Sequence, residues 1–144
     1  MEQRLSLITL GVADLARSRR FYEDGLGWRP SGAGNDEVAF YQLGGIALAL
    51  WGRDELAADA GLPRPGPPRA FAGFALAHNV RARDEVDAIL SKAAAAGGRV
   101  LRAGNGTAWG GYTGYFADPD GHLWEVAWNP HFALDAAGAL RLPA

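Results

Sequence analysis

Glu125 is the residue whose position in this sequence most clearly indicates chemistry. It lies in the strand-like run His122–Trp128, where alternation places it on one face with the apolar Leu123 and Ala127. An unpaired carboxylate among apolar neighbours is costly. Glu125 is therefore expected either to have a hydrogen-bond partner or to meet a ligand, and in the second case it suits general acid or base catalysis.

The histidines do not form a recognisable metal-binding set. His122 has the opposite strand parity to Glu125, and His131 lies beyond Pro130, outside the last expected strand. We interpret all three histidines, His78 included, as surface or hydrogen-bonded residues, because a transition metal needs three or more ligands. The chain has no cysteine, which excludes thiolate ligands, disulfides and cysteine nucleophiles.

Three aromatic residues lie where they could line a pocket. Trp51 ends an expected hairpin, while Trp109 and Tyr112 belong to the glycine-flanked segment 107–112. Loop aromatics often contact ligands, and glycines give such a loop the mobility of a lid. The alternative is that these rings fill the core, as we expect for Trp28, Trp124 and Trp128.

The hairpin that carries Glu125 is predicted from its turn. In Asp118-Pro119-Asp120-Gly121 the proline suits the second turn position, the first aspartate accepts a backbone N–H, and the glycine allows a positive φ. The sequence therefore predicts paired antiparallel strands at Tyr112–Ala117 and His122–Trp128.

Similar reasoning divides the chain into two halves with the same order of elements. The first is expected to form strand Leu5–Val12, helix Asp14–Leu26, and strands Trp28–Pro30, Glu37–Leu43 and Ile46–Trp51, the last two joined by Gly44-Gly45. The second is expected to form strand Phe71–Val80, helix Ala82–Ala96, strand Arg99–Ala103, a loop over Gly104–Gly111 and the hairpin described above. Each half reads β-α-β-β-β, which indicates an internal duplication.

The expected organisation is a single domain of 144 residues built from these two modules. The first module spans residues 4–52, a proline-rich linker residues 53–69, the second module residues 70–130 and a C-terminal tail residues 131–144. The tail is apolar at Phe132, Leu134, Leu140 and Leu142, so we expect it to cover a sheet edge or to pack on a second copy in a homodimer.

The run Asp118-Pro119-Asp120-Gly121-His122-Leu123-Trp124-Glu125 resembles the end of a module in the vicinal oxygen chelate superfamily. Asp14-Leu15, Phe21-Tyr22 and Leu26-Gly27-Trp28 add to the resemblance, which covers about residues 4–130. It implies an α+β fold in which two tandem βαβββ modules pair into an open, cup-shaped antiparallel sheet. The superfamily includes glyoxalase I, extradiol dioxygenases and bleomycin-resistance proteins, and its members are often dimers.

The resemblance also provides a test for a metal site. Metal enzymes of the superfamily take one ligand from the first and last strand of each module, and the matching positions here are Leu7, Ala49, Ala75 and Glu125, with Phe74 replacing Ala75 if the strand has a bulge. Three of the four are apolar, so no metal cofactor is expected. His78 would reach that face only through the same bulge.

We therefore predict a glyoxalase-like or bleomycin-resistance-like protein with a metal-free apolar pocket for a small aromatic or cationic molecule. Its lining is expected to comprise Leu7, Ala49, Trp51, Phe74, Ala75, Trp109, Tyr112 and Glu125. The alternative is a metal-dependent lyase, isomerase or dioxygenase using Glu125 as a catalytic residue. The net charge of −2 favours neither nucleic acid nor an anionic membrane as a partner. Without an export signal or membrane-spanning run, the expected location is the cytoplasm.

Overall fold

The computed structural model describes the chain except residues 2, 4, 65, 67–71, 73, 143 and 144. Two compact units divide it, residues 1–70 and residues 71–144, and each is described by itself. Pro65, Pro67 and Pro68 of the expected linker, and Phe71 at the expected start of the second module, lie outside the described residues.

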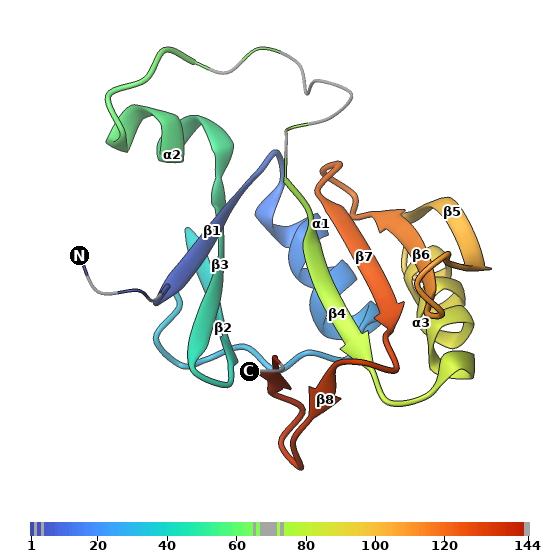
Figure 1. The fold of residues 1–144 in the computed structure, drawn as a ribbon. Helices are drawn as coiled ribbons and strands as arrows, with labels where there is room; N and C mark the ends of the chain where they lie inside the picture. The colour runs from blue at the N-terminus through green and yellow to red at the C-terminus, as the bar shows by residue number, and fades with distance from the viewer. Residues whose placement is uncertain (2, 4, 65, 67–71, 73, 143–144) are drawn as a thin grey trace. The chain divides into compact units, whose positions relative to one another are not determined.

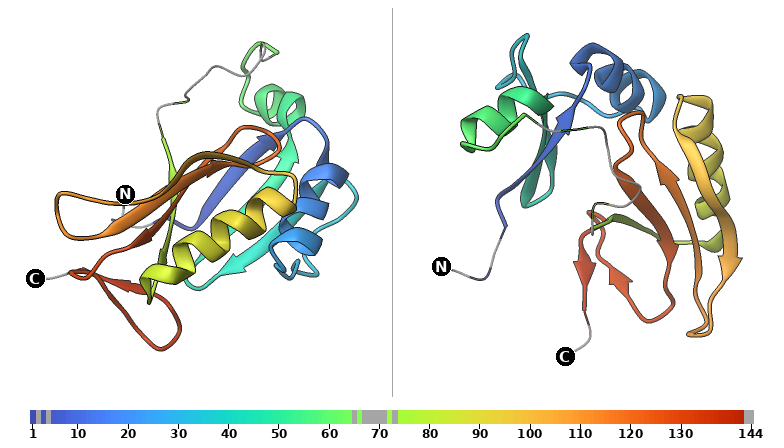
Figure 2. Two further views of the ribbon diagram at one scale, coloured as in Figure 1. Left: turned by 90° about the vertical axis from the view of Figure 1, so that its right-hand side faces the viewer. Right: turned by 90° about the horizontal axis from the view of Figure 1, so that it is seen from above.

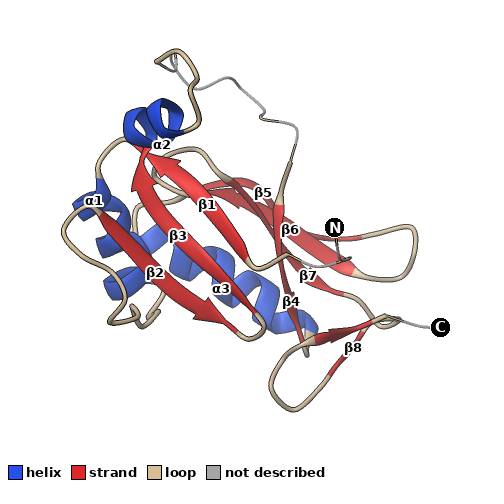
Figure 3. Ribbon diagram, turned by 90° about the vertical axis from the view of Figure 1, so that its left-hand side faces the viewer, coloured by secondary structure: helices blue, strands red, loops and turns tan. Residues whose placement is uncertain are grey.

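The first unit contains a mixed three-stranded sheet. Strands β1 (Leu7–Val12), β2 (Val38–Leu43) and β3 (Ile46–Gly52) are ordered β1-β3-β2, as Figure 3 shows. β1 runs parallel to β3, and β2 pairs antiparallel with β3 through the predicted two-residue turn, where Gly44 has a φ of 64°. Helix α2 (Arg53–Asp59) follows β3 directly.

The first helix is shorter than predicted and changes type. α1 (Leu15–Arg20) is capped at its N-terminus by Asp14, whose Oδ1 accepts the Arg17 N–H at 3.0 Å. A π-helix, η1 (Phe21–Gly25), continues it, with the Leu26 N–H bonded to the Phe21 carbonyl at 2.9 Å. The wider turn places both aromatic side chains of this segment in the core, since Phe21 is 1% exposed and Tyr22 is fully buried.

The strand expected at Trp28–Pro30 is absent from the described structure, so the first unit has three strands where four were expected. Trp28 packs instead against the helix and sheet, with its ring 5.0 Å from that of Tyr22 and 5.6 Å from that of Tyr41. Its large apolar area is buried by these aromatic neighbours rather than by strand pairing.

The second unit has the predicted β-α-β-β-β order. Its elements are β4 (Leu76–Val80), α3 (Arg83–Ala95), β5 (Arg99–Gly106), β6 (Tyr112–Ala117) and β7 (Leu123–Trp128). The sheet order is β4-β7-β6-β5, with β4 parallel to β7 and the other pairs antiparallel (Figure 1). β5 extends to Gly106 and so includes the first part of the expected loop Gly104–Gly111. The chain is thus a mixed α+β protein, as predicted.

The turn between β6 and β7 forms as its sequence predicts. Asp118 Oδ1 accepts the backbone N–H groups of Asp120 and His122 at 2.9 and 2.8 Å, and Gly121 has a φ of 90°. This turn sets the register in which Ala117 lies opposite Leu123 and, two residues further along each strand, Tyr115 lies opposite Glu125.

Helix α3 covers one face of the second sheet, which Figure 2 shows from two further directions. It buries Val86, Leu90 and Ala93 against β5, β6 and β7. The approach is closest at Gly114 of β6, where a Cβ atom would collide with Leu90 of α3 and lie 3.1 Å from the carbonyl oxygen of Arg102. The hydrogen atom of glycine therefore permits this packing.

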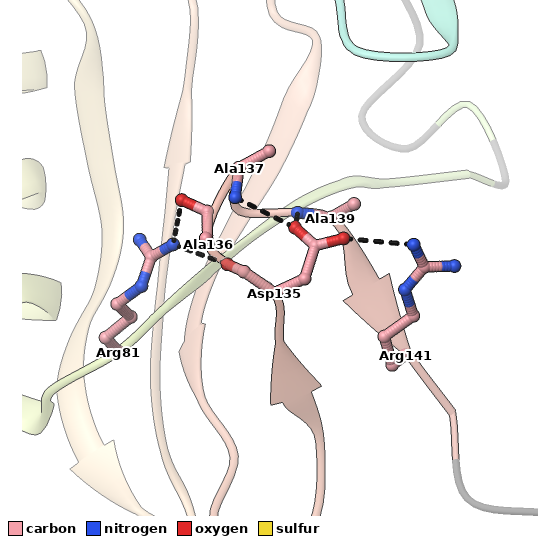
Figure 4. Close-up of polar contacts among 6 residues, drawn as sticks. All are labelled: Arg81, Asp135, Ala136, Ala137, Ala139 and Arg141. Carbon is pink, nitrogen blue, oxygen red and sulfur yellow. Dashed lines mark hydrogen bonds and ion pairs between the residues drawn. The ribbon is translucent and has the colours of Figure 1, made fainter.

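The C-terminal tail forms a hairpin of its own. β8 (Ala133–Leu134) and β9 (Leu140–Arg141) pair around a turn in which Asp135 accepts the N–H groups of Ala137 and Ala139 at 3.0 and 2.9 Å (Figure 4). The guanidinium of Arg81, just after β4, donates to the Asp135 carbonyl at 2.7 Å and so holds the hairpin to the end of that strand.

Candidate functional site

Glu125 belongs to a row of side chains that crosses the second sheet. Strand register pairs Arg102 of β5 with Tyr115 of β6, Tyr115 with Glu125 of β7, and Glu125 with Ala77 of β4. Because Gly114 faces α3, alternation directs its neighbour Tyr115 and the whole row to the opposite face of the sheet. We refer to Arg102, Tyr115, Glu125 and Ala77 as the Glu125 row.

Glu125 and Tyr115 are directly bonded. The Tyr115 hydroxyl donates to Oε1 of Glu125 at 2.8 Å, and Glu125 is half-buried. Burial, followed by this hydrogen bond, raises the pKa of Tyr115, so the phenol remains a donor at neutral pH. Among the hydrogen bonds of the described residues none reaches Oε2 of Glu125, which leaves that oxygen available to a ligand.

Arg102 is held in place by two contacts on the other side of Tyr115. Its guanidinium carbon lies 4.8 Å from the centroid of the Tyr115 ring, and its Nη2 donates to the hydroxyl of Thr113. Thr113 is 2% exposed. The Tyr115 ring therefore lies between a positive side chain, Arg102, and a negative one, Glu125.

Ala77 leaves space on the other side of Glu125. It lies directly beside Glu125 in the register of β4 and β7, and its methyl side chain is exposed. Strands at this spacing are about 4.8 Å apart, so a longer side chain at residue 77 would reach the carboxylate. The methyl group keeps that approach open.

Tyr112 lies on the α3 face and so does not share a face with Glu125. Its hydroxyl donates to Oδ2 of Asp87 at 3.0 Å, and the guanidinium of Arg83 lies 4.3 Å from its ring centroid. Both partners belong to α3. The hydrogen bond to Asp87 is the main cause of a raised pKa for Tyr112. Tyr112 therefore connects the helix to the sheet on the face opposite Glu125.

His78 also faces α3. It is paired with Val126, one residue out of phase with the Glu125 row, so no bulge turns it toward the carboxylate. Reduced hydration lowers the pKa of His78, and the nearby Glu85 carboxylate of α3 opposes that shift. Within the part of the chain that the structure describes, no three histidine, aspartate or glutamate side chains gather as a metal site would require.

The other second-unit residues of the predicted pocket lie outside the regular strands. Phe74 and Ala75 precede β4 and are exposed, with Phe74 at 45%. Trp109 lies in the turn between β5 and β6, which three hydrogen bonds between Thr107, Gly110 and Gly111 close tightly. Its indole lies over Gly111 and is 45% exposed, so a flat apolar surface is presented to a ligand.

The first-unit residues of the predicted pocket share one face of their own sheet. Tyr41 and Leu48, which are paired in register, face the helix, because the Tyr41 hydroxyl donates to Glu23 of η1 at 3.0 Å. Alternation then places Leu7, Ala49 and Trp51 on the opposite face. Leu7 is 44% exposed, whereas Ala49 is 1% exposed. That these residues and Glu125 line one pocket stays a prediction.

Comparison with models of protein families identifies the family of this chain. The model of the Glyoxalase/Bleomycin resistance protein/Dioxygenase superfamily matches residues 4–126. The chain belongs to this superfamily.

Solved structures agree with membership of the superfamily. The chain is 42% identical to a glyoxalase-related enzyme from Fulvimarina pelagi, with a TM-score of 0.89 over 99% of this chain and 100% of that one. A glyoxalase/bleomycin resistance protein/dioxygenase family enzyme from Burkholderia phytofirmans is 18% identical, with a TM-score of 0.72 over 85% of this chain and 96% of that one. The lactoylglutathione lyase of Agrobacterium tumefaciens is 23% identical, with a TM-score of 0.64 over 89% and 95%. The last two show similarity of fold alone. A search of curated proteins found no match.

The donor atoms of this superfamily member do not fit a metal at the positions that the family uses. Leu7, Ala49 and Ala75 have hydrocarbon side chains, and Glu125 alone supplies oxygen ligands. Zinc, iron or manganese would need two or three further protein ligands. We therefore derive no chemical step through a metal ion.

Sequence reasoning missed Tyr115, Arg102 and Thr113. Tyr115 could have been found by counting outward from the Asp118–Gly121 turn, since Ala117 opposite Leu123 places Tyr115 opposite Glu125. Arg102 could not, because the register of β5 against β6 shifts between Val100 and Arg102 and again between Arg102 and Asn105.

Proposed function

We propose that this superfamily member binds a small molecule over the Glu125 row without a metal ion. The observation that carries the proposal is the state of the Glu125 carboxylate. Tyr115 occupies Oε1, whereas no hydrogen bond among the described residues occupies Oε2, so a half-buried anionic oxygen is available to a donor. A hydrogen bond to a charged group contributes about 1.5–3 kcal/mol, enough to fix the orientation of a small ligand.

The expected ligand is aromatic or carries a cationic group. Glu125 suits an ammonium or other donor, because a carboxylate is acceptor-only when ionised. The exposed indole of Trp109 in the second unit provides a flat apolar area on which an aromatic ring can stack. Antibiotic-sequestering members of the family bind such molecules, which makes this class of ligand the first to test.

Thermal unfolding of the full chain with benzylamine, whose ammonium group can donate a hydrogen bond to Oε2 of Glu125, tests this binding. A ligand at 100 times its dissociation constant stabilises by about 2.7 kcal/mol. With an unfolding entropy of about 2.1 cal/mol/K per residue, that is a rise of about 9 °C for this chain. Glu125→Gln should abolish most of the rise, whereas Glu37→Gln, at an exposed residue of the first unit, should retain it. Equal shifts in the two variants would show that Glu125 is not the binding group.

Elemental analysis of the purified chain tests the metal-free part of the proposal. We expect no stoichiometric iron, nickel, zinc or manganese, because Glu125 stands without further ligands at the family positions. If the native chain contains a stoichiometric metal that Glu125→Gln removes, the metal-free site is refuted. The alternative of a metal-dependent lyase, isomerase or dioxygenase is then favoured.

A second candidate function is proton transfer, which the Tyr115–Glu125 hydrogen bond favours. Oε2 of Glu125 can accept a proton from the carbon next to a carbonyl, while the Tyr115 hydroxyl, which donates to Oε1, holds the carboxylate in position. The similar protein from Fulvimarina pelagi is described as an enzyme. Exchange of the methyl protons of pyruvate in D₂O, followed by NMR, should then be faster with the native chain than with Glu125→Gln.

The homodimer and the cytoplasmic location remain predictions. Among the described residues no helix has both the length and the apolar character that a membrane crossing requires. Phe132 and Leu140 of the C-terminal hairpin are 36% and 41% exposed, which supports burial against a second copy. Light scattering of the purified chain measures the mass, and a monomer at micromolar concentration would refute the dimer.

A further inference from the structure

We propose that Arg102 binds an anionic group of the ligand, so that the Glu125 row takes a zwitterion with an ammonium at Glu125 and a carboxylate at Arg102. This rests on the proposed function, because it assumes that a ligand occupies Glu125. It narrows the class of ligand, since a molecule with only a positive charge would leave the Arg102 guanidinium without an anionic partner.

The spacing of the two charges fits a small molecule. Arg102 and Glu125 are the register partners of Tyr115 on its two sides, so two strand spacings, about 10 Å, separate their backbones. Both side chains lean toward Tyr115, one contacting its ring and the other its hydroxyl. The charged ends are therefore closer together than their backbones, as an amino-acid-like ligand requires.

Arg102 has unused hydrogen-bonding capacity. A guanidinium has five N–H donors, and the partners of Arg102 here are the neutral hydroxyl groups of Thr113 and Tyr115, neither of which is a carboxylate. No ion pair among the described residues involves Arg102. Arg81 and Arg141 of the same unit differ, since they bond to the carbonyl and carboxylate of Asp135 respectively.

Arg102 is also held in position before a ligand arrives. Contact with the Tyr115 ring and the bond to Thr113 reduce its rotamer freedom, so less conformational entropy is lost on binding. A planar guanidinium can then donate two parallel hydrogen bonds to one carboxylate.

Three matched probes test the proposal by calorimetry with the full chain. L-phenylalanine carries both charges, phenethylamine lacks the carboxylate, and phenylpropionate lacks the ammonium. We expect L-phenylalanine to bind about tenfold or more tightly than either of the others, the ratio that one charge-assisted hydrogen bond gives.

Arg102→Gln should remove the preference for L-phenylalanine over phenethylamine while leaving phenethylamine affinity equal or higher. Arg102→Lys, which keeps the charge but not the planar fork, should retain part of the preference. Arg99→Gln, at an exposed arginine of the same strand, removes the same charge and should change each affinity by less than about twofold. Thermal unfolding without ligand checks that the variants fold.

The outcomes separate this inference from the function on which it rests. Glu125-dependent binding of phenethylamine with no gain for L-phenylalanine would overturn the role of Arg102 and leave the proposed function standing. A preference that survives Arg102→Gln would also overturn it. If none of the probes binds, or if Glu125→Gln leaves every affinity unchanged, the proposed function itself fails.

Discussion

Replacing Gly114 by alanine perturbs the place where helix and sheet approach most closely. The new methyl group would overlap Leu90, which is 4% exposed, and would lie 3.1 Å from both the Arg102 oxygen and the Gly104 nitrogen. A buried leucine and two backbone atoms have little room to move. Overpacking of this kind typically costs about 1–3 kcal/mol. With about 0.3 kcal/mol/K of unfolding entropy for a chain of 144 residues, Gly114→Ala should lower the melting temperature by about 3–10 °C.

Circular dichroism measures the melting temperatures, and Gly106→Ala is the matched control. Gly106 lies at the end of β5, has no positive φ, and has nothing within 4 Å of the position that a Cβ would take. The restricted unfolded chain should then make alanine neutral or slightly stabilising, by up to about 1 kcal/mol. Melting temperatures within about 1 °C of each other for the two variants would refute the close packing of α3 on β6.

For two further substitutions the structure predicts the direction of the effect. Asp135→Ala should speed hydrogen exchange at the Ala137 and Ala139 amides. In the native chain the Ala139 N–H is the main cause of the lowered pKa of Asp135, so the protection is complete above the ordinary pKa of about 3.8 and should be lost as the pH falls through the lower pKa of the folded state. NMR exchange rates at pH 5 and pH 2, divided by the rates of the unstructured peptide at the same pH, measure both effects, and unchanged ratios would contradict the hairpin geometry. Burial, followed by the bond to Glu23, raises the pKa of Tyr41, so its contribution to stability is complete below about pH 10 and falls as the unfolded phenol ionises. The difference in urea stability between the native chain and Tyr41→Phe should therefore narrow between pH 8 and pH 11, and a constant difference would contradict it.

Features that depend on a few neighbouring residues were predictable from the sequence. The Asp118–Gly121 turn forms as expected because its aspartate, proline and glycine each act within four residues. The Gly44-Gly45 hairpin and the Asp14 cap were predictable for the same reason.

Features that depend on packing or on strand register were not predictable from the sequence. The spacing of Trp28–Pro30 predicts a strand that does not form, whereas the ring of Trp28 packs against those of Tyr22 and Tyr41, in line with the expectation that it contributes to the core. The π-helical turn at Phe21–Gly25 inserts one residue per turn, which hydrophobic spacing over so short a segment does not reveal. Strand parity identified Glu125, but the two irregularities of β5 concealed the guanidinium that lies in the same row.

In the Glu125 row, the side chains that could carry out chemistry are distinct from the backbone hydrogen bonds that hold the sheet together. Each of its four positions sits on a different strand, and the backbone ladder between those strands does not depend on which side chain is attached. A gene encoding this chain could therefore acquire a new reactivity by single codon changes: histidine at residue 77, beside Glu125, would supply an imidazole where there is now a methyl group. Directed evolution aimed at residues 77, 102 and 115 would explore that freedom with little risk to folding.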